Sequence, residues 1–331
     1  MISSLGAGNI VASTIFPLAA IVSLVLRLRA RHSGVGSWFI DDYMIIVALL
    51  SVIGSAIINI LAVAKYGLGT HILFINPQDL FSIAKLEYAD GLVMIVSSTF
   101  TKLSTVYLYR RVLPPYKKSI PTIALLVVLY AWGVAYLATD LFSCIPISSR
   151  WDVSNPGYCY STDREDEAFD ISNLVINFLI LLRPITQLRE FRLLSPRMKA
   201  WIGGSISLGI LVIVVIAIHI AISYYPEGIV DASYNLAKLS LLSQLEASLF
   251  VICACVLSLA SSHPISSLEE KKEEEGRYEK PELAADDVPR QMGELDSAAI
   301  VELPVPDAEL AGNEQFHQLD DTSTNRPRER V

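Results

Sequence analysis

The sequence predicts an all-α membrane protein, a bundle of seven transmembrane helices followed by an acidic, disordered tail. The chain of 331 residues is 52% apolar with a mean hydropathy of +0.45, and its apolar residues form blocks close to the length that crosses a bilayer as a helix. Charge is also segregated, because residues 262–331 carry 18 acidic and 8 basic residues whereas the rest carries 16 and 18. We therefore expect a membrane domain over 1–261 and a disordered cytosolic tail over 262–331.

Seven apolar segments are separated by short charged loops. The third segment is apolar enough to enter a bilayer yet carries Glu87, Asp90 and Lys102. It is also the longest, so that its ends extend past the ~30 Å hydrocarbon core. The expected spans are residues 8–26, 43–64, 80–112, 120–141, 168–188, 201–224 and 236–260.

The basic residues of the loops predict the orientation of the bundle. When the loops are assigned alternately to the two sides, those after the first, third and fifth spans hold twelve Lys and Arg residues and the opposite set holds three. Loops rich in Lys and Arg stay in the cytosol. The N-terminus is therefore expected outside and the C-terminus inside.

This orientation places the loop over 142–167 in an oxidising compartment. It contains Cys144 and Cys159, for which a disulfide is the natural interpretation, and two free thiols are the alternative. A disulfide across so short a loop would restrain it by about 3 kcal/mol on the chain-entropy model. Cys253 and Cys255 lie within the last span, where packing is the expected role, and we expect no metal site there.

Four ionisable residues within the spans form the candidate polar core: Asp90, Lys102, His219 and Glu246. Charge at this depth is costly, so these side chains should face other helices or a water-filled cavity. Glu246 is expected to pair with Lys102 or with His219. Alternatively, Lys102 extends its long side chain toward Arg110 at the membrane surface, and His219 is a hydrogen-bonded core residue.

Two further patterns lie at the ends of spans. Asp41 and Asp42 begin the second span beside Tyr43, where they either cap the helix or pair with Arg27 or Arg29. The sequence KYGLGTH follows the same span, and its Gly67 and Gly69 most simply supply positive φ angles in a turn.

The motifs of common enzyme classes are missing from the sequence. It contains no G-x-x-x-x-G-K-[ST], H-E-x-x-H or G-x-S-x-G pattern. We therefore expect no catalytic residues and a protein that is not an enzyme, and we expect no nucleic acid among its partners.

Five short blocks follow one another in an order that resembles the fungal rhodopsin-like domain family: VLRLRARHSGVGSWFIDDY, KYGLGTH, KLSTVYLYRRV, CIPISSRWDVSNPGYC and LSQLEASLFVICAC. The resemblance covers about residues 23–259. It implies a seven-helix, receptor-like integral membrane protein of filamentous fungi, in the plasma membrane or secretory pathway. Such proteins are grouped with G-protein-coupled-receptor-like sensors, and are also encoded near secondary-metabolite pathways.

The resemblance assigns family motifs to positions of this chain. These are Asp41, Asp42 and Tyr43; Gly67, Gly69 and His71; Lys102, Leu103 and Ser104; Trp151 between Cys144 and Cys159; and Glu246. Several family positions differ here. Asn177 replaces an Asp, Arg183 and Pro184 replace Leu-Pro, and the usual Arg near His219 and Trp near Leu242 are missing.

Two functional hypotheses follow. The first is a receptor or sensor of an extracellular signal, with an unknown small-molecule ligand and a G-protein α subunit or another cytosolic partner. The second is a transporter or an accessory membrane protein of a secondary-metabolite pathway, although no internal repeat supports transport. No cofactor is expected, and retinal is disfavoured because the last span offers only Lys238, near its outer end, for a Schiff base.

Overall fold

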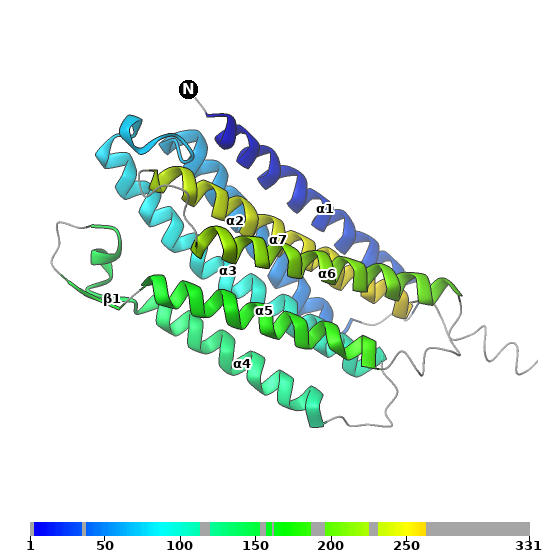
Figure 1. Ribbon diagram of the computed structural model, residues 1–331. Coiled ribbons are helices and arrows are strands. Elements are labelled where there is room, and N and C mark those ends of the chain that lie inside the picture. Colours follow the sequence, from blue (N-terminus) through cyan, green and yellow to red (C-terminus); the bar gives the residue numbers. More distant parts are fainter. Residues whose placement is uncertain are drawn as a thin grey trace, which may run out of the picture. The chain divides into compact units, whose positions relative to one another are not determined.

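A computed structural model describes residues 3–34, 38–112, 120–152, 157–160, 162–186, 196–224 and 231–262. Most of these residues form long helices that run side by side as one bundle (Figure 1). The helices are α1 (Ser4–Gly34), α2 (Ile40–Tyr66), α3 (Pro77–Val112), α4 (Ile120–Leu141), α5 (Thr162–Thr186), α6 (Pro196–Tyr224) and α7 (Ala232–Ser262).

A small disulfide-closed segment joins α4 to α5. Strand β1 (Cys144–Ile145) pairs antiparallel with β2 (Tyr158–Cys159), and the 3-10 turn η2 (Ile147–Arg150) lies between them. Cys144 stands opposite Cys159 in this register, and the two form the expected disulfide. We call residues 144–159 the disulfide loop, of which 153–156 lie outside the described residues. It lies at the same end of the bundle as the N-terminus (Figure 1).

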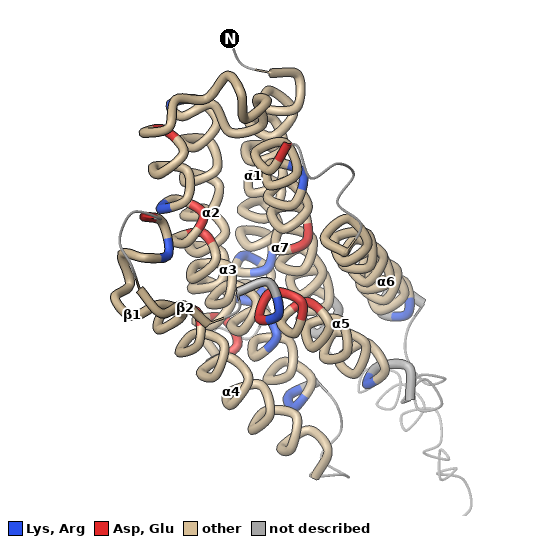
Figure 2. The backbone as a smooth tube through the Cα atoms, turned by 60° about the vertical axis from the view of Figure 1, so that its left-hand side comes forward, with Lys and Arg blue, Asp and Glu red and all other residues tan. Residues whose placement is uncertain are grey.

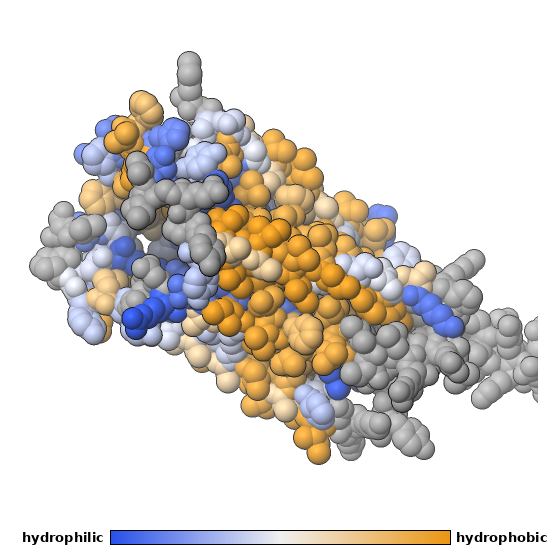
Figure 3. Space-filling view, viewed as in Figure 1, coloured by the Kyte–Doolittle hydropathy of each residue, from blue (hydrophilic) through white to orange (hydrophobic). Residues whose placement is uncertain are grey.

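The surface of the bundle is suited to a bilayer. Large apolar side chains are exposed on the outer helix faces, and Figure 3 shows a continuous hydrophobic surface over the middle of the molecule with hydrophilic side chains toward its ends. Six of the described helices are long and apolar enough to cross a membrane. The chain is thus a multi-pass membrane protein.

Helix α5 is the one outside those six. It begins with the charged sequence TDREDE and carries two asparagines, so its apolar stretch is shorter than those of the other helices. The structure confirms seven long helices, whereas the count of seven spans stays a prediction. The expected tail beyond α7 lies outside the described residues.

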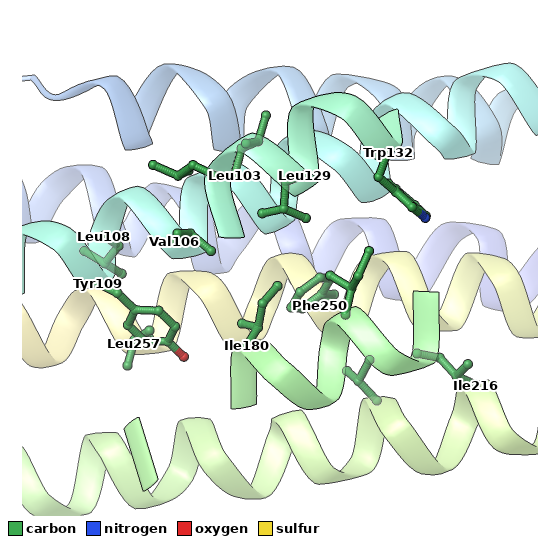
Figure 4. Close-up of a cluster of buried hydrophobic side chains, with 13 residues drawn as sticks. Leu103, Val106, Leu108, Tyr109, Leu129, Trp132, Ile180, Ile216, Phe250 and Leu257 are labelled. Atoms are coloured by element: carbon green, nitrogen blue, oxygen red, sulfur yellow. The ribbon is translucent and has the colours of Figure 1, made fainter. Parts of the chain in front are cut away.

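The bundle interior holds separate apolar clusters. The largest contains 13 buried residues from α3 to α7, among them Leu103, Trp132 and Phe250 (Figure 4). A second cluster joins α1, α2 and α7 around Ile45. Helices α3 and α4 approach closely at Gly133, where an added Cβ atom would lie 2.5 Å from the Thr99 side chain. A small residue is therefore required at this crossing.

The end of α2 confirms the expected role of its glycines. Gly67 caps the helix with φ 77°, and Gly69 has φ 88°. The short turn η1 (Ile72–Phe74) then leads into α3. Because L-residues with a Cβ rarely adopt these angles, the two glycines allow the chain to reverse within a few residues.

Candidate functional site

Three groups of polar and charged side chains within the helices include residues of α3. Figure 2 shows that charged positions are sparse along the tube and that most of it is uncharged. Buried polar groups in a membrane domain must find partners inside the protein. The partners of each group therefore indicate what the bundle interior is built to hold.

The first group, the lysine cluster, consists of Lys102, Ser98, Asn173 and Glu246. The Lys102 side chain is fully buried, and its Nζ donates to Asn173 Oδ1 at 2.6 Å and to Ser98 Oγ. Asn173 Nδ2 in turn donates to Glu246 Oε1 at 2.7 Å. The Asn173 amide thus satisfies a cation with its oxygen and a carboxylate with its nitrogen.

Aromatic rings complete the surroundings of Lys102. Its Nζ lies 4.8 Å from the centre of the Trp132 ring and 5.5 Å from that of Phe250. Trp132 is held by stacking on Phe169 and by a bond from its Nε1 to Ser172 Oγ. These ring faces attract the ammonium group where water is excluded.

This arrangement corrects two expectations for Lys102. It does not bond Glu246 directly, because Asn173 of α5 lies between them. Nor does it extend toward Arg110, since its partner Ser98 lies one turn nearer the start of α3. A sequence gives no reason to select Asn173 among the neutral polar residues of the spans, and so this central residue was missed.

His219 forms a neighbouring pair of its own. Its Nδ1 lies 3.2 Å from Asp170 Oδ2, and its Nε2 lies 3.4 Å from Ser243 Oγ. His219 is therefore a bonded core residue whose carboxylate partner is on α5, whereas Glu246 had been expected. The polar core proposed from the sequence is divided among different helix pairs.

Asp90 belongs to a second group, which we call the Asp90 cluster: Asp90 with Ser55, Asn59, Ser240 and Gln244. Asn59 Nδ2 contacts Asp90 Oδ2 at 3.4 Å, and Asn59 Oδ1 accepts a bond from Ser240. Ser55 donates to Gln244 Oε1 at 2.9 Å. The cluster joins α2, α3 and α7, apart from Lys102.

The third group, the arginine–aspartate cluster, contains Arg27, Arg31, Asp41, Asp42 and Arg111. Arg27 donates to Asp41 at 2.7 Å and to Asp42 at 3.0 Å, while Arg31 donates to Asp41 at 2.7 Å. Arg111 lies 3.6 Å from Asp41. Fully buried Arg27 also reaches the Ala254 carbonyl oxygen. The cluster therefore ties α1, α2, α3 and α7 together.

Both roles expected for the paired aspartates are present, and Arg27 is one of the two partners that the sequence offered. Asp42 Oδ2 accepts a bond from the Phe39 backbone N–H at 3.2 Å, and both carboxylates pair with Arg27. The second partner is Arg31, whereas Arg29 is exposed. Arg27 and Arg31 are four residues apart and therefore share one face of α1, whereas Arg29 is two residues from each and lies on another face. Ser104, of the Lys-Leu-Ser motif, donates to the Asp41 carbonyl oxygen at 2.7 Å.

The disulfide loop contacts the opposite end of α3. The ring of Trp151 lies 5.7 Å from that of Tyr88, and Lys85 Nζ lies 5.7 Å from the Trp151 ring centre. Tyr88 also donates through its hydroxyl to the Leu141 carbonyl oxygen at 3.2 Å. These contacts seat the loop on α3, and they assign a packing role to Trp151.

His71 of the KYGLGTH sequence links the ends of α2 and α7. Its Nδ1 lies 2.8 Å from Asp231 Oδ2, and its ring stacks on Tyr234 at 5.8 Å. Gly69 donates through its backbone N–H to Ser233 Oγ at 3.3 Å. The glycine turn is thereby positioned against α7. Tyr43, the last residue of the Asp-Asp-Tyr motif, is exposed and lies beside Trp38.

Within the described residues, no group of three or more His, Cys, Asp or Glu side chains is placed to hold a metal ion. Cys253 and Cys255 are free thiols, and Cys253 Sγ lies 3.3 Å from the Ser205 carbonyl oxygen. Their positions agree with a packing role.

Comparison with known families identifies the membrane domain. Residues 26–263 match the model of the fungal rhodopsin domain, which covers most of the chain. The chain belongs to the fungal rhodopsin domain family. All three polar groups therefore lie within the family domain, and so does the disulfide loop.

Two relatives of this fungal rhodopsin domain protein carry informative descriptions. A polyenoic acids biosynthesis gene cluster protein, Ba17b of Metarhizium anisopliae, is 24% identical over 257 residues, covering 73% of this chain and 70% of the relative. A SAT4 family membrane protein of Emericella nidulans is 27% identical over 174 residues, covering 52% of this chain and 45% of that protein. The second comparison thus spans less than half of the relative.

Proposed function

We propose that the protein is a receptor-like sensor of an extracellular signal. The observation that supports this most directly is the sequence of contacts along α3. The first third of the helix holds the disulfide loop through Tyr88, and its last third carries buried Lys102 and meets Asp41 through Ser104 and Arg111. A displacement of α3 at one end would therefore alter the contacts of a charged cluster at the other.

The proposed topology has seven spans, with the N-terminus outside and the C-terminal tail in the cytosol. Basic loop residues favour this orientation. The disulfide supports it independently, because disulfides persist in oxidising compartments and the Cys144–Cys159 bond lies at the N-terminal end of the bundle. Helix α5 is the proposed seventh span, with Asn173 bonded inside the bundle. We propose that the protein is located in the plasma membrane.

Lys102 is the residue through which a ligand would act. Its partners are a neutral amide and a hydroxyl, which an acidic or hydrogen-bond-accepting small molecule would replace. Asn173 bonds both Lys102 and Glu246. If the ligand displaces Asn173 from Lys102, the bond between Asn173 and Glu246 would also change. The cytosolic partner would be a G-protein α subunit or another protein that binds the bundle at the end that carries the arginine–aspartate cluster. No cofactor or catalytic step is part of this proposal.

The test combines a ligand screen with a recruitment assay. Purified protein is screened by thermal shift against metabolites of the source organism, and each stabilising compound is tested for recruitment of a G-protein α subunit in reconstituted membranes. A sensor predicts compound-dependent recruitment that is lost in Lys102→Met and retained in the matched exposed variant Lys65→Met. The proposal would be contradicted by compounds that stabilise the protein and are transported by it across the membrane but recruit no cytosolic partner.

A second candidate function is suggested by one relative. Ba17b is a protein of a gene cluster for polyenoic acid biosynthesis. An accessory or transport role in a metabolite pathway is therefore the alternative for this chain. It predicts metabolite flux through reconstituted protein that falls in Glu246→Gln, without any effect of the metabolite on partner recruitment.

A further inference from the structure

Asp90 is a buried carboxylate without an ionic partner among the described residues. It is 6% exposed, and it lies 13 residues into α3, about 20 Å along the helix axis from Pro77. Its Oδ2 atom contacts the Asn59 amide, whereas its Oδ1 atom is buried with no hydrogen-bond partner in the described part of the chain. This distinguishes Asp90 from Asp41, Asp42 and Asp170, which all face Arg or His side chains.

The groups that face Asp90 from α2 and α7 are neutral. Ser55 and Asn59 come from α2, and Ser240 and Gln244 come from α7; all four are buried. The nearest ionisable residue on α3 is Glu87, one turn earlier, and as a carboxyl group it supplies no positive charge. Lys102 lies three turns further along the helix and is engaged by Asn173 and Ser98. The protein thus provides no counter-charge here among the described residues.

A lone carboxylate inside a membrane domain is strongly disfavoured unless a positive charge accompanies it. The surrounding side chains supply oxygen atoms that retain free lone pairs after their mutual bonds, namely the Ser55 and Ser240 hydroxyls and the Gln244 carbonyl. Carboxylate, hydroxyl and amide oxygens are the ligands that hard cations prefer. Asp90, which is more than nine-tenths buried, is the one carboxylate of the Asp90 cluster. A single positive charge therefore balances the cluster.

We propose that the Asp90 cluster binds a monovalent alkali cation, specifically Na⁺, between α2, α3 and α7. Asp90 Oδ1 supplies the charge, and the Ser55, Ser240 and Gln244 oxygens complete the ligand set. Because these ligands come from three helices, the cation holds α2, α3 and α7 together inside the bundle. The proposal is independent of whether the protein is a sensor or a transporter.

The test is a thermal-shift titration of the full chain in detergent, with NaCl replaced by choline chloride at constant ionic strength. Na⁺ is expected to raise the melting temperature with the logarithm of one plus the ratio of the Na⁺ concentration to Kd, by about 3 °C at a concentration tenfold above the dissociation constant. Asp90→Asn should abolish this rise, and Ser240→Ala should require a higher Na⁺ concentration for the same rise. Asp79→Asn, which removes a carboxylate from the first turn of the same helix, should retain the full response.

Several results would overturn the proposal. Equal melting temperatures in Na⁺ and choline would exclude the site in the wild-type chain, even if Asp90→Asn fails to fold. An equal Na⁺ response in Asp90→Asn would place the cation elsewhere. A response to pH with none to Na⁺ would show that Asp90 carries a proton, and a response to Ca²⁺ in place of Na⁺ would show a divalent site.

Discussion

The arginine–aspartate cluster and the lysine cluster both provide partners for buried charged side chains, but they do so in different ways. In the first, Arg27 and Arg31 bond two carboxylates directly through several charge-assisted hydrogen bonds. In the second, the charges of Lys102 and Glu246 are separated by the neutral Asn173 amide. A direct ionic network resists rearrangement because each broken bond leaves a buried charge. The bridging amide is neutral, and the sensor function that we propose assigns the ligand response to the lysine cluster.

The largest expected effect comes from breaking the direct network. Arg27→Met removes the central cation and leaves Asp41 and Asp42 buried with fewer partners, which should cost about 3 to 5 kcal/mol. Detergent melting temperature and cell-surface yield should both fall sharply. Arg29→Met, two residues away and exposed, is the matched control and should behave like the wild type. Equal losses in the two variants would show that the pairing of Arg27 does not stabilise the bundle.

The next effect tests the bridge. Asn173→Leu keeps the branching of the side chain but removes the hydrogen bonds to both charged groups, with an expected loss of about 2 to 3 kcal/mol. Chemical or thermal unfolding in detergent measures it. The exposed Val175→Leu, on the same helix, is the control and should change little. A loss as small as that of the control would mean that Lys102 and Glu246 do not depend on Asn173.

Lys102 and Glu246 should be energetically coupled although they are not in direct contact. Lys102→Met and Glu246→Gln should each cost about 1 to 3 kcal/mol, less than Arg27→Met, because each charge keeps a polar neighbour. The double variant should recover part of the summed loss in a double-mutant cycle. Additive losses would show that Asn173 does not transmit the interaction.

The smallest effect concerns the link between α3 and α2. Ser104→Ala removes one neutral hydrogen bond to the Asp41 carbonyl oxygen, with an expected cost of about 1 kcal/mol. Ser51→Ala provides the control, because Ser51 is partly exposed and bonds only the Val47 carbonyl oxygen of its own helix among the described contacts. A change in melting temperature no larger than that of Ser51→Ala would contradict a role for Ser104 in joining the helices.

Sequence reasoning predicted the long helices because apolar blocks and charged loops are local patterns. It placed the first span at 8–26, whereas α1 covers Ser4–Gly34, since helices continue beyond the hydrocarbon core. It also predicted the Cys144–Cys159 bond. The choice of Arg31 over Arg29 follows from helix periodicity and was open to prediction.

The bridge by Asn173 was not predictable in the same way. It depends on how α5 is rotated about its axis relative to α3 and α7. The local sequence pattern of one helix does not specify this rotation. The same applies to the separation of Asp90 from Lys102, because Asp90 faces α2 while Lys102 faces α5. Periodicity places residues on the faces of one helix, but it does not select the neighbouring helix that each face meets.

Coupling along α3 is the central claim, and hydrogen–deuterium exchange of the reconstituted full chain tests it most directly. Trp151→Ala removes the contact of the disulfide loop with Tyr88, and Trp201→Ala, a partly exposed residue at the start of α6, is the control. The account predicts that Trp151→Ala raises exchange in the disulfide loop and also around residues 104–111 and 39–42, at the far end of α3. Faster exchange confined to the loop would contradict it.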